Sequence, residues 1–218
     1  MSSNYLDIIR PGINTTFQDK GRDHLYHIGI PFSGAMDNRN YLIANNLVNN
    51  DLNLPVIEFA YQGPLLKYKG DKIYIVITGD IKFQIVRDDG YKIIGQPYQV
   101  YCIENNYKID LQSTNKSVYG YISISENFIL KKFWGSFSVN TKAKIGSNNG
   151  EKITNKQKVF DFELHPSDKG KGEGQMRIFR GNTYPLLEKI KPRTILDIGG
   201  NIGTTISNSS TWYPFGKC

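Results

Sequence analysis

Cysteine and histidine are scarce in this sequence, whose 218 residues contain two cysteines and three histidines. Cys102 and Cys218 are too few for a disulfide framework or for a thiolate metal cluster. His24, His27 and His165 lack the number and spacing of ligands that a zinc site requires. These scarcities argue against a disulfide-stabilised scaffold and against a zinc enzyme.

Long apolar runs are missing as well. No stretch of about 18 apolar residues exists. The chain begins with Met1, Ser2, Ser3 and Asn4, which form neither the basic region nor the apolar stretch of a secretory signal. The sequence therefore predicts a soluble, cytoplasmic protein with no membrane partner.

Blocks of like charge are also absent. The formal net charge is +7 and the isoelectric point is about 9.2, a balance that raises the question of nucleic-acid binding. The basic residues are scattered along the chain, whereas nucleic-acid-binding domains concentrate them in a patch or stripe. A diffuse surplus of lysine is typical of a solubilising surface, so we expect no nucleic-acid partner.

Enough apolar residues remain to build a core. Hydrophobic residues make up 39% of the chain and charged residues 22%, with 14 tyrosines and 11 phenylalanines. This composition is unlike that of a disordered protein. The length allows one domain, or one domain and a piece of another.

Short β-rich runs separated by turn residues fill the middle of the chain. Asp88-Asp89-Gly90 is the clearest hairpin signal, and the alternation in 119–124 predicts a strand with one buried face. The five predicted strands are 72–78, 81–87, 98–103, 107–111 and 118–124. We therefore predict a mainly β fold, either a barrel or a sandwich.

One helix is expected before these strands. The Asp37 side chain can accept hydrogen bonds from the free N–H groups of a first helical turn, and the polar residues 49–51 mark the end of the helix. The apolar residues that recur on one face are Tyr41, Ala44 and either Leu47 or Val48.

The composition changes after Val159. Residues 165–174 contain almost no apolar side chain and alternate glycine with charge, as linkers and exposed loops do. Farther on, 194–198 is an apolar strand that enters a glycine-rich turn. We divide the chain into a β domain (1–159), a linker (160–182) and a short α/β fragment (183–218).

The densest set of chemically useful residues lies near the N-terminus. Glycines, which permit tight loops, and prolines, which fix φ, alternate there with polar side chains. The polar residues that such loops would present are Arg10, Gln18, Asp19, Arg22 and Ser33. Residue types alone leave two interpretations open: ordinary turns that contain one Arg–Asp bridge, or a ligand site.

The string RPGINTTFQDKGR, followed by GIPFSGAMD, resembles the opening of the carboxyltransferase-domain family. This family includes allophanate hydrolase subunit 2, the C subunit of 5-oxoprolinase and the matching domain of urea amidolyase. The likeness continues to about residue 159, through Ala44, Asn45, Leu47, Val48 and Asn49, then Glu58, Gly63 and Pro64, then Thr78-Gly79, Gly135-Ser136, Ser138 and 145–150. The resemblance implies a cyclophilin-like β-barrel, which is incomplete because only about half of a family domain is covered.

The resemblance also implies a function. Such a chain would be a component of an ATP-dependent amidohydrolase or carboxyltransferase that acts on a small amide (5-oxoproline, allophanate or urea) together with a partner subunit. Residues 1–159 contain no Gly-x-x-x-x-Gly-Lys-[Ser/Thr] phosphate loop, so ATP is expected to be handled by the complex, and carboxybiotin would come through a partner. A noncatalytic protein-binding module of the same family is the alternative.

On this interpretation Arg22, Gln18 and Asp19 are the candidate catalytic residues. A guanidinium group stays charged and binds two oxygens at once, and we expect Arg22 to converge with Arg10 on one small anionic group. Gln18 and Asp19 are suited to orient an amide or to position a proton.

Arg10, Ser33 and Asp37 are the candidate substrate-binding residues. Ser33 lacks the Gly-x-Ser-x-Gly elbow of a nucleophilic serine, so we expect it to donate or accept hydrogen bonds only. Asp37 is expected to cap the helix, with an arginine partner as the alternative. One departure from the family pattern is Phe137, which stands where an arginine is usual and removes a possible anion contact.

The tail carries a second resemblance. Its strand and glycine turn resemble the first cofactor-binding motif of FkbM-type methyltransferases, with Asp197, Gly199, Asn201 and Gly203 in the matching places. A glycine turn after a strand is a weak signal by itself, and no acidic residue follows that would bind the ribose. A fragment of an S-adenosylmethionine-dependent methyltransferase is therefore the third hypothesis, and S-adenosylmethionine is not expected as a cofactor.

Overall fold

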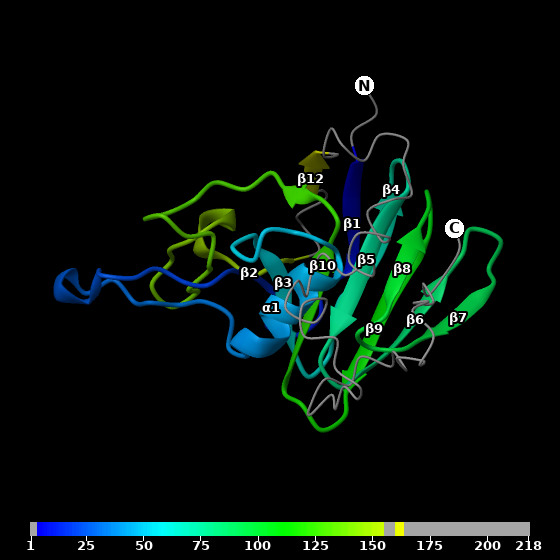
Figure 1. The fold of residues 1–218 in the computed structure, drawn as a ribbon, viewed down its shortest axis with the longest axis horizontal. Coiled ribbons are helices and arrows are strands. Elements are labelled where there is room, and N and C mark those ends of the chain that lie inside the picture. The colour runs from blue at the N-terminus through cyan, green and yellow to red at the C-terminus, as the bar shows by residue number, and fades with distance from the viewer. Residues whose placement is uncertain (1–3, 155–159, 164–218) are drawn as a thin grey trace, which may run out of the picture.

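The computed structural model describes residues 4–154 and the strand 160–163, and these residues form two antiparallel β-sheets with one α-helix (Figure 1). The seven-stranded sheet has the order β11 (Asn127–Phe128), β12 (Phe160–Glu163), β1 (Asn4–Arg10), β4 (Leu65–Lys69), β9 (Lys108–Thr114), β6 (Ile81–Val86) and β7 (Lys92–Gly95). The five-stranded sheet has the order β2 (Thr16–Gln18), β3 (Val56–Ala60), β10 (Tyr119–Ile124), β5 (Ile73–Thr78) and β8 (Val100–Ile103). The helices are η1 (Tyr26–Ile28), α1 (Asn38–Leu47) and η2 (Asn148–Gly150).

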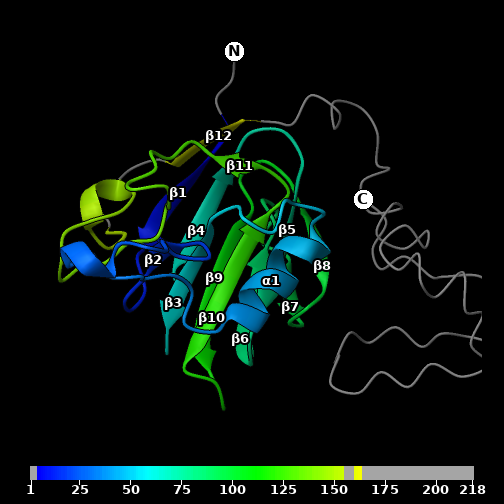
Figure 2. The same cartoon turned by 60° about the vertical axis from the view of Figure 1, so that its left-hand side comes forward.

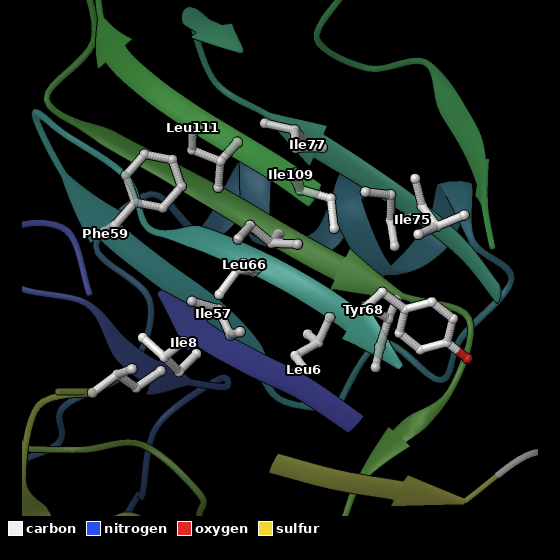
Figure 3. Packing of buried hydrophobic residues seen from close by; sticks show 14 of the residues in the cluster. Leu6, Ile8, Ile57, Phe59, Leu66, Tyr68, Ile75, Ile77, Ile109 and Leu111 are labelled. Atoms are coloured by element: carbon white, nitrogen blue, oxygen red, sulfur yellow. The ribbon is translucent and has the colours of Figure 1, made fainter. Parts of the chain in front are cut away.

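The main core lies between the two sheets. Alternate residues of each strand point to the same face, and the inward positions of both sheets are filled by branched aliphatic and aromatic side chains. Figure 3 shows Leu6, Ile8, Ile57, Phe59, Leu66, Tyr68, Ile75, Ile77, Ile109 and Leu111 in this cluster. The removal of these apolar side chains from water is the main driving force for the fold.

Helix α1 covers the opposite face of the five-stranded sheet (Figure 2). A second apolar cluster forms there, in which Tyr41 and Ala44 of α1 pack with Val56 and Tyr121 of the sheet. Both faces of this sheet are therefore buried at β3 and along most of β10 and β5. The prediction of one buried face for 119–124 was wrong for this reason, because 120–124 are all buried.

The predicted mainly β fold is confirmed by the two sheets. Each of the five strands predicted from the sequence corresponds to a strand of the structure, and the β6–β7 hairpin turns at Gly90, whose φ is +86°. The predicted helix is α1, and Asp37 is its N-cap. Strands β1, β2, β3, β4, β7, β11 and β12 were not predicted.

The linker expected over 160–182 begins with strand β12, which pairs antiparallel with β1 and β11. The rest of that range and the α/β fragment predicted for 183–218 lie outside the described residues. Within the described part of the chain, no helix has both the length and the apolar character needed to cross a membrane.

Candidate functional site

The site is built where the loop that follows β2 runs beside the loop that precedes α1. The Ala35 N–H donates to the Asp19 carbonyl and the Arg22 N–H donates to the Phe32 carbonyl, both at 2.9 Å. Beyond the Arg22–Phe32 bond the chain extends away from the sheets and carries η1 at its far end, the blue loop at the left of Figure 1. The two backbone bonds hold Ser33 next to the segment that contains Asp19 and Arg22.

The carboxylate of Asp19 ties this loop to a distant segment. It is buried and accepts hydrogen bonds from the Ser136 hydroxyl at 2.6 Å, the Phe137 N–H at 2.7 Å and the Gly21 N–H at 2.8 Å. The Ser138 hydroxyl also donates to it. With four donors directed at its two oxygens, this side chain fixes the positions of both segments.

The guanidinium of Arg22 is buried beside Asp19, with only 3% of the residue exposed. Its Nη2 donates to the Ser138 carbonyl and its Nε donates to the Phe133 carbonyl at 3.4 Å. Its Nη1 is buried without a hydrogen-bond partner. Burial lowers the pKa of Arg22 and the charge of Asp19 partly offsets this effect, but an arginine pKa starts so high that the group stays charged.

Two further buried polar atoms near Arg22 have no hydrogen-bond partner. The Gln18 side chain donates through Nε2 to the Thr16 hydroxyl at 2.9 Å and to the Val139 carbonyl at 3.0 Å, while its Oε1 accepts nothing. Ser33 has a left-handed φ of +58° and a buried, unpartnered hydroxyl. Buried polar atoms are nearly always satisfied, and Gln18, Arg22 and Ser33 each leave one such atom without a partner.

Asp37 caps α1. Its Oδ1 accepts from the Asn40 N–H at 3.0 Å and its Oδ2 accepts from the Asn40 side-chain amide at 2.7 Å. Its own N–H donates to the Tyr121 hydroxyl at 2.7 Å. The structure thus shows the capping role of Asp37.

Glu58 lies under the start of α1. Its Oε2 accepts hydrogen bonds from the Met36 N–H and from the Tyr121 hydroxyl, both at 2.8 Å. Burial is the main cause that raises the pKa of Glu58, the charge of Asp37 adds to it, and these two hydrogen bonds oppose it. Thr16, Glu58 and Tyr121 are cross-strand neighbours on one face, so a polar row crosses the sheet and contacts the chain just before α1 through Met36 and Asp37.

Arg10 lies at the end of β1 and is bonded to a different part of the fold. Its Nη2 donates to Asp110 Oδ1 at 2.8 Å and to the Leu111 carbonyl at 3.0 Å. The hydrogen bonds of Arg10 and Arg22 thus reach separate segments, and the expected convergence of the two cations stays a prediction.

The other residues singled out in the sequence contribute less to the candidate site or lie outside the described residues. His24 and His27 are exposed. Phe137, where the family pattern has arginine, contributes its N–H to Asp19 and has Lys132 Nζ 5.1 Å from its ring centroid. The described ranges contain no group of three or more side chains arranged to hold a metal. Asp197, Gly199, Asn201 and Gly203 lie outside the described residues.

Two features of the site escaped prediction from residue patterns. The roles of Ser136 and Ser138 depend on a pairing with Asp19 across more than a hundred residues, and only the family likeness at Gly135-Ser136 and Ser138 pointed to them. Glu58 had a local signal, because it is a carboxylate inside the apolar run 56–60. A charged residue in a strand with both faces buried needs polar partners.

Comparison with known proteins finds urea amidolyases and 5-oxoprolinase C subunits among the similar proteins. The chain is 29% identical to urea amidolyase of Saccharomyces cerevisiae over 164 residues, which cover 75% of this chain and 8% of that protein. It is 30% identical to the C subunit of 5-oxoprolinase from Haemophilus influenzae over 145 residues, which cover 66% of this chain and 45% of that protein. The chain therefore spans less than half the length of these relatives.

Solved structures show the same fold. The crystal structure of TTHA0988 superposes with a TM-score of 0.64 at 26% identity, over 75% of this chain and 32% of that one. The Kluyveromyces lactis urea carboxylase gives a TM-score of 0.67 at 22% identity, over 77% of this chain and 14% of that one, a likeness of fold alone.

The family resemblance seen in the sequence is confirmed by these matches. A family model described as the carboxyltransferase domain, subdomain A and B, matches residues 28–186, which is well over half of the chain. The chain belongs to the carboxyltransferase-domain family.

Proposed function

We propose that this chain supplies part of the binding site for a small amide in an ATP-dependent amidohydrolase or carboxyltransferase, and that it works with a partner subunit. The similar proteins include urea amidolyase and the C subunit of 5-oxoprolinase. The candidate substrates are 5-oxoproline, allophanate and urea. Because the chain spans only part of these relatives, the proposal concerns a component of an enzyme.

The observation that carries the proposal is that three of the four buried side-chain atoms without a hydrogen-bond partner in the described residues belong to the segment 18–33. These three are Gln18 Oε1, Arg22 Nη1 and Ser33 Oγ, and the fourth is Arg10 Nε. Gln18 Oε1 can only accept a hydrogen bond, Arg22 Nη1 can only donate one, and a serine hydroxyl does either. An amide offers a carbonyl oxygen and an N–H group, which are the complementary pair.

Each residue then has a defined task. Arg22 donates to the carbonyl oxygen of the amide and favours the negative charge that develops there during attack or carboxyl transfer. Gln18 accepts the N–H and orients the substrate. Asp19 has its oxygens occupied by four donors, so we assign it the task of holding Arg22 and the 133–139 segment in place.

ATP and carboxybiotin belong elsewhere in the complex. A nucleoside triphosphate requires several donors or a metal to balance its charge, whereas Arg22 is the one buried guanidinium near Gln18 and Ser33 in the described residues. The residues present fit a small amide better than a triphosphate. Arg10 is already neutralised by Asp110, and we leave it out of the site.

Calorimetric titration of the purified protein with 5-oxoproline, allophanate and urea tests the site. One of the three is expected to bind, and Arg22→Ala, Ser33→Ala and Gln18→Leu should each weaken that binding about tenfold or more. Arg87→Ala removes an exposed arginine from the β6–β7 hairpin and serves as the matched control.

Turnover is then tested in the complex reconstituted with its partner subunit. ATP hydrolysis that depends on the bound amide and disappears with Arg22→Ala supports the enzyme component. Amide binding with no turnover supports the noncatalytic module, and no binding by a folded sample contradicts the proposal.

A further inference from the structure

A tight turn next to the site carries an exposed tryptophan. The N–H of Phe133 donates to the Ser136 carbonyl at 2.8 Å and the Ser136 N–H donates back to the Phe133 carbonyl at 3.3 Å. The two residues between them, Trp134 and Gly135, have φ values of +53° and +81°. Two successive positive φ values are those of a type I′ turn, which favours Asn-Gly at these positions.

The conformation and the exposure of Trp134 are both energetically unfavourable. A bulky side chain at positive φ is uncommon and strained, and 52% of the residue is exposed to solvent. Its ring lies near that of Phe133, with the ring centroids 6.1 Å apart, and Phe133 itself is 38% exposed. Nothing in the packing of the described residues explains why a large apolar ring should be held outward at this point.

The base of the turn is fixed to the candidate site. Arg22 Nε donates to the Phe133 carbonyl and the Ser136 hydroxyl donates to the Asp19 carboxylate. The tip of the turn is therefore presented on a rigid support. Rigidly held aromatic side chains are the usual anchors of protein interfaces, because little conformational entropy is lost when they bind.

The sequence on either side of the turn is basic. Lys131 and Lys132 precede it directly and are exposed. In the segment 129–152 five lysines (131, 132, 142, 144 and 152) stand against one acidic residue, Glu151. An acidic surface on a partner would complement this charge.

We propose that the Phe133–Trp134 turn is the anchor of a protein–protein interface, and that its partner is a different protein with an apolar pocket surrounded by acidic residues. A second copy of this chain is disfavoured because it carries the same net charge of +7. Single-stranded nucleic acid is bound by several aromatic residues along one basic groove, whereas the aromatic residues here form one turn. The interface adds a binding surface to the partnership in the proposed function and does not depend on amide binding.

The test begins by finding the partner. p-Benzoylphenylalanine is placed at position 134 in cells that produce the protein, crosslinks are made with light, and the crosslinked protein and its attached peptide are identified by mass spectrometry. The identified protein is then purified, and its binding to the wild-type chain, Trp134→Ala and Lys131→Glu/Lys132→Glu is measured without any amide. Tyr91→Ala, which removes another exposed aromatic residue at a hairpin, is the control.

We expect the crosslink to fall in an acidic segment of one other protein. Trp134→Ala should then weaken the purified complex about 30-fold, the charge reversals should weaken it further at low salt, and Tyr91→Ala should leave it unchanged. Crosslinks only to the chain itself, to RNA or to no macromolecule overturn the proposal, as does a purified complex that Trp134→Ala does not weaken. Arg22→Ala, which tests the amide site, is scored separately by calorimetry, so failure of one proposal is distinguishable from failure of the other.

Discussion

Asp19 and Ser136, separated by 117 positions in the sequence, are joined by a buried hydrogen bond of 2.6 Å from the Ser136 hydroxyl to Asp19 Oδ1. This bond links the loop after β2 to the segment between β11 and η2. Because Arg22 also bonds to that segment, through the carbonyls of Phe133 and Ser138, the geometry of the candidate site depends on the link.

Replacement of Asp19 by alanine should destabilise the protein strongly. The change leaves the buried donors of Ser136, Ser138 and Phe137 without their acceptor, and the free energy of unfolding should fall by about 3 kcal/mol. Urea denaturation followed by circular dichroism measures this loss. Asp89→Ala, at an exposed turn where the carboxylate accepts from the Tyr91 N–H, should cost less than about 1 kcal/mol; equal losses for the two variants would contradict this role of Asp19.

Gly146 is expected to tolerate no side chain. Its φ is +113°, and a Cβ at this position would overlap the Ser138 carbonyl oxygen, which accepts the hydrogen bond from Arg22 Nη2. Gly146→Ala should lower the free energy of unfolding by about 3 kcal/mol, from the backbone conformation and the overlap together, and should also weaken amide binding.

Gly29 provides the matched comparison for Gly146. Its φ is +76° and an added Cβ would meet no atom within 4 Å, so Gly29→Ala carries only the conformational cost of about 1 kcal/mol. Thermal unfolding and calorimetry on both variants check the difference. If Gly146→Ala binds the amide as the wild type does, the Ser138 carbonyl is not needed to hold Arg22.

The raised pKa of Glu58 predicts how stability depends on pH. The folded state holds the Glu58 proton more tightly than the unfolded state, so the stabilisation is complete below the unfolded pKa of about 4.3 and is lost as the pH rises through the folded value. Glu58→Gln keeps an acceptor for Met36 and Tyr121 but does not ionise. The melting temperature of Glu58→Gln relative to the wild type should therefore increase from pH 4 to pH 8, and a constant difference across this range would show that Glu58 does not titrate in it.

The N-cap of α1 at Asp37 is expected to contribute a modest amount to the free energy of unfolding. Asp37→Ala removes the acceptor of the Asn40 N–H and should cost about 1 kcal/mol of unfolding free energy, whereas Asp37→Asn should retain most of it. Chemical denaturation of the two variants gives the comparison. A cost for asparagine as large as that for alanine would indicate that the charge of Asp37 matters more than its capping geometry.

Local sequence patterns were sufficient to predict the elements whose formation depends on neighbouring residues. The N-cap at Asp37, the hairpin turn at Gly90 and the strands β5, β6, β8, β9 and β10 each depend on residues close together in the sequence, and each was predicted. Strand β1 has three polar residues among its seven and β2 has only three residues, so neither gives a strong local strand signal. In β3, Glu58 interrupts the apolar run.

The geometry of the candidate site depends on contacts between residues far apart in the sequence, which no short stretch of sequence reveals. Gln18, Asp19 and Arg22 were singled out from residue type and family likeness, but their partners lie more than a hundred residues away. The same limit applies to β10. Its burial on both faces results from packing of α1 on the outer face of the sheet, and no alternation within 119–124 encodes the position of that helix.

Strand β10 also indicates where the chain will accept added residues. Tyr121 and Ser123 face the helix while Ile122 and Ile124 face the other sheet, so a single inserted residue would exchange the two sets and place hydroxyl groups in the apolar layer between the sheets. The tip at Asp88–Gly90 is exposed, and an added Cβ on Gly90 would meet no atom within 4 Å. An affinity tag or a fluorescent label inserted at that tip should leave the fold intact, whereas one placed within β10 should prevent expression of soluble protein.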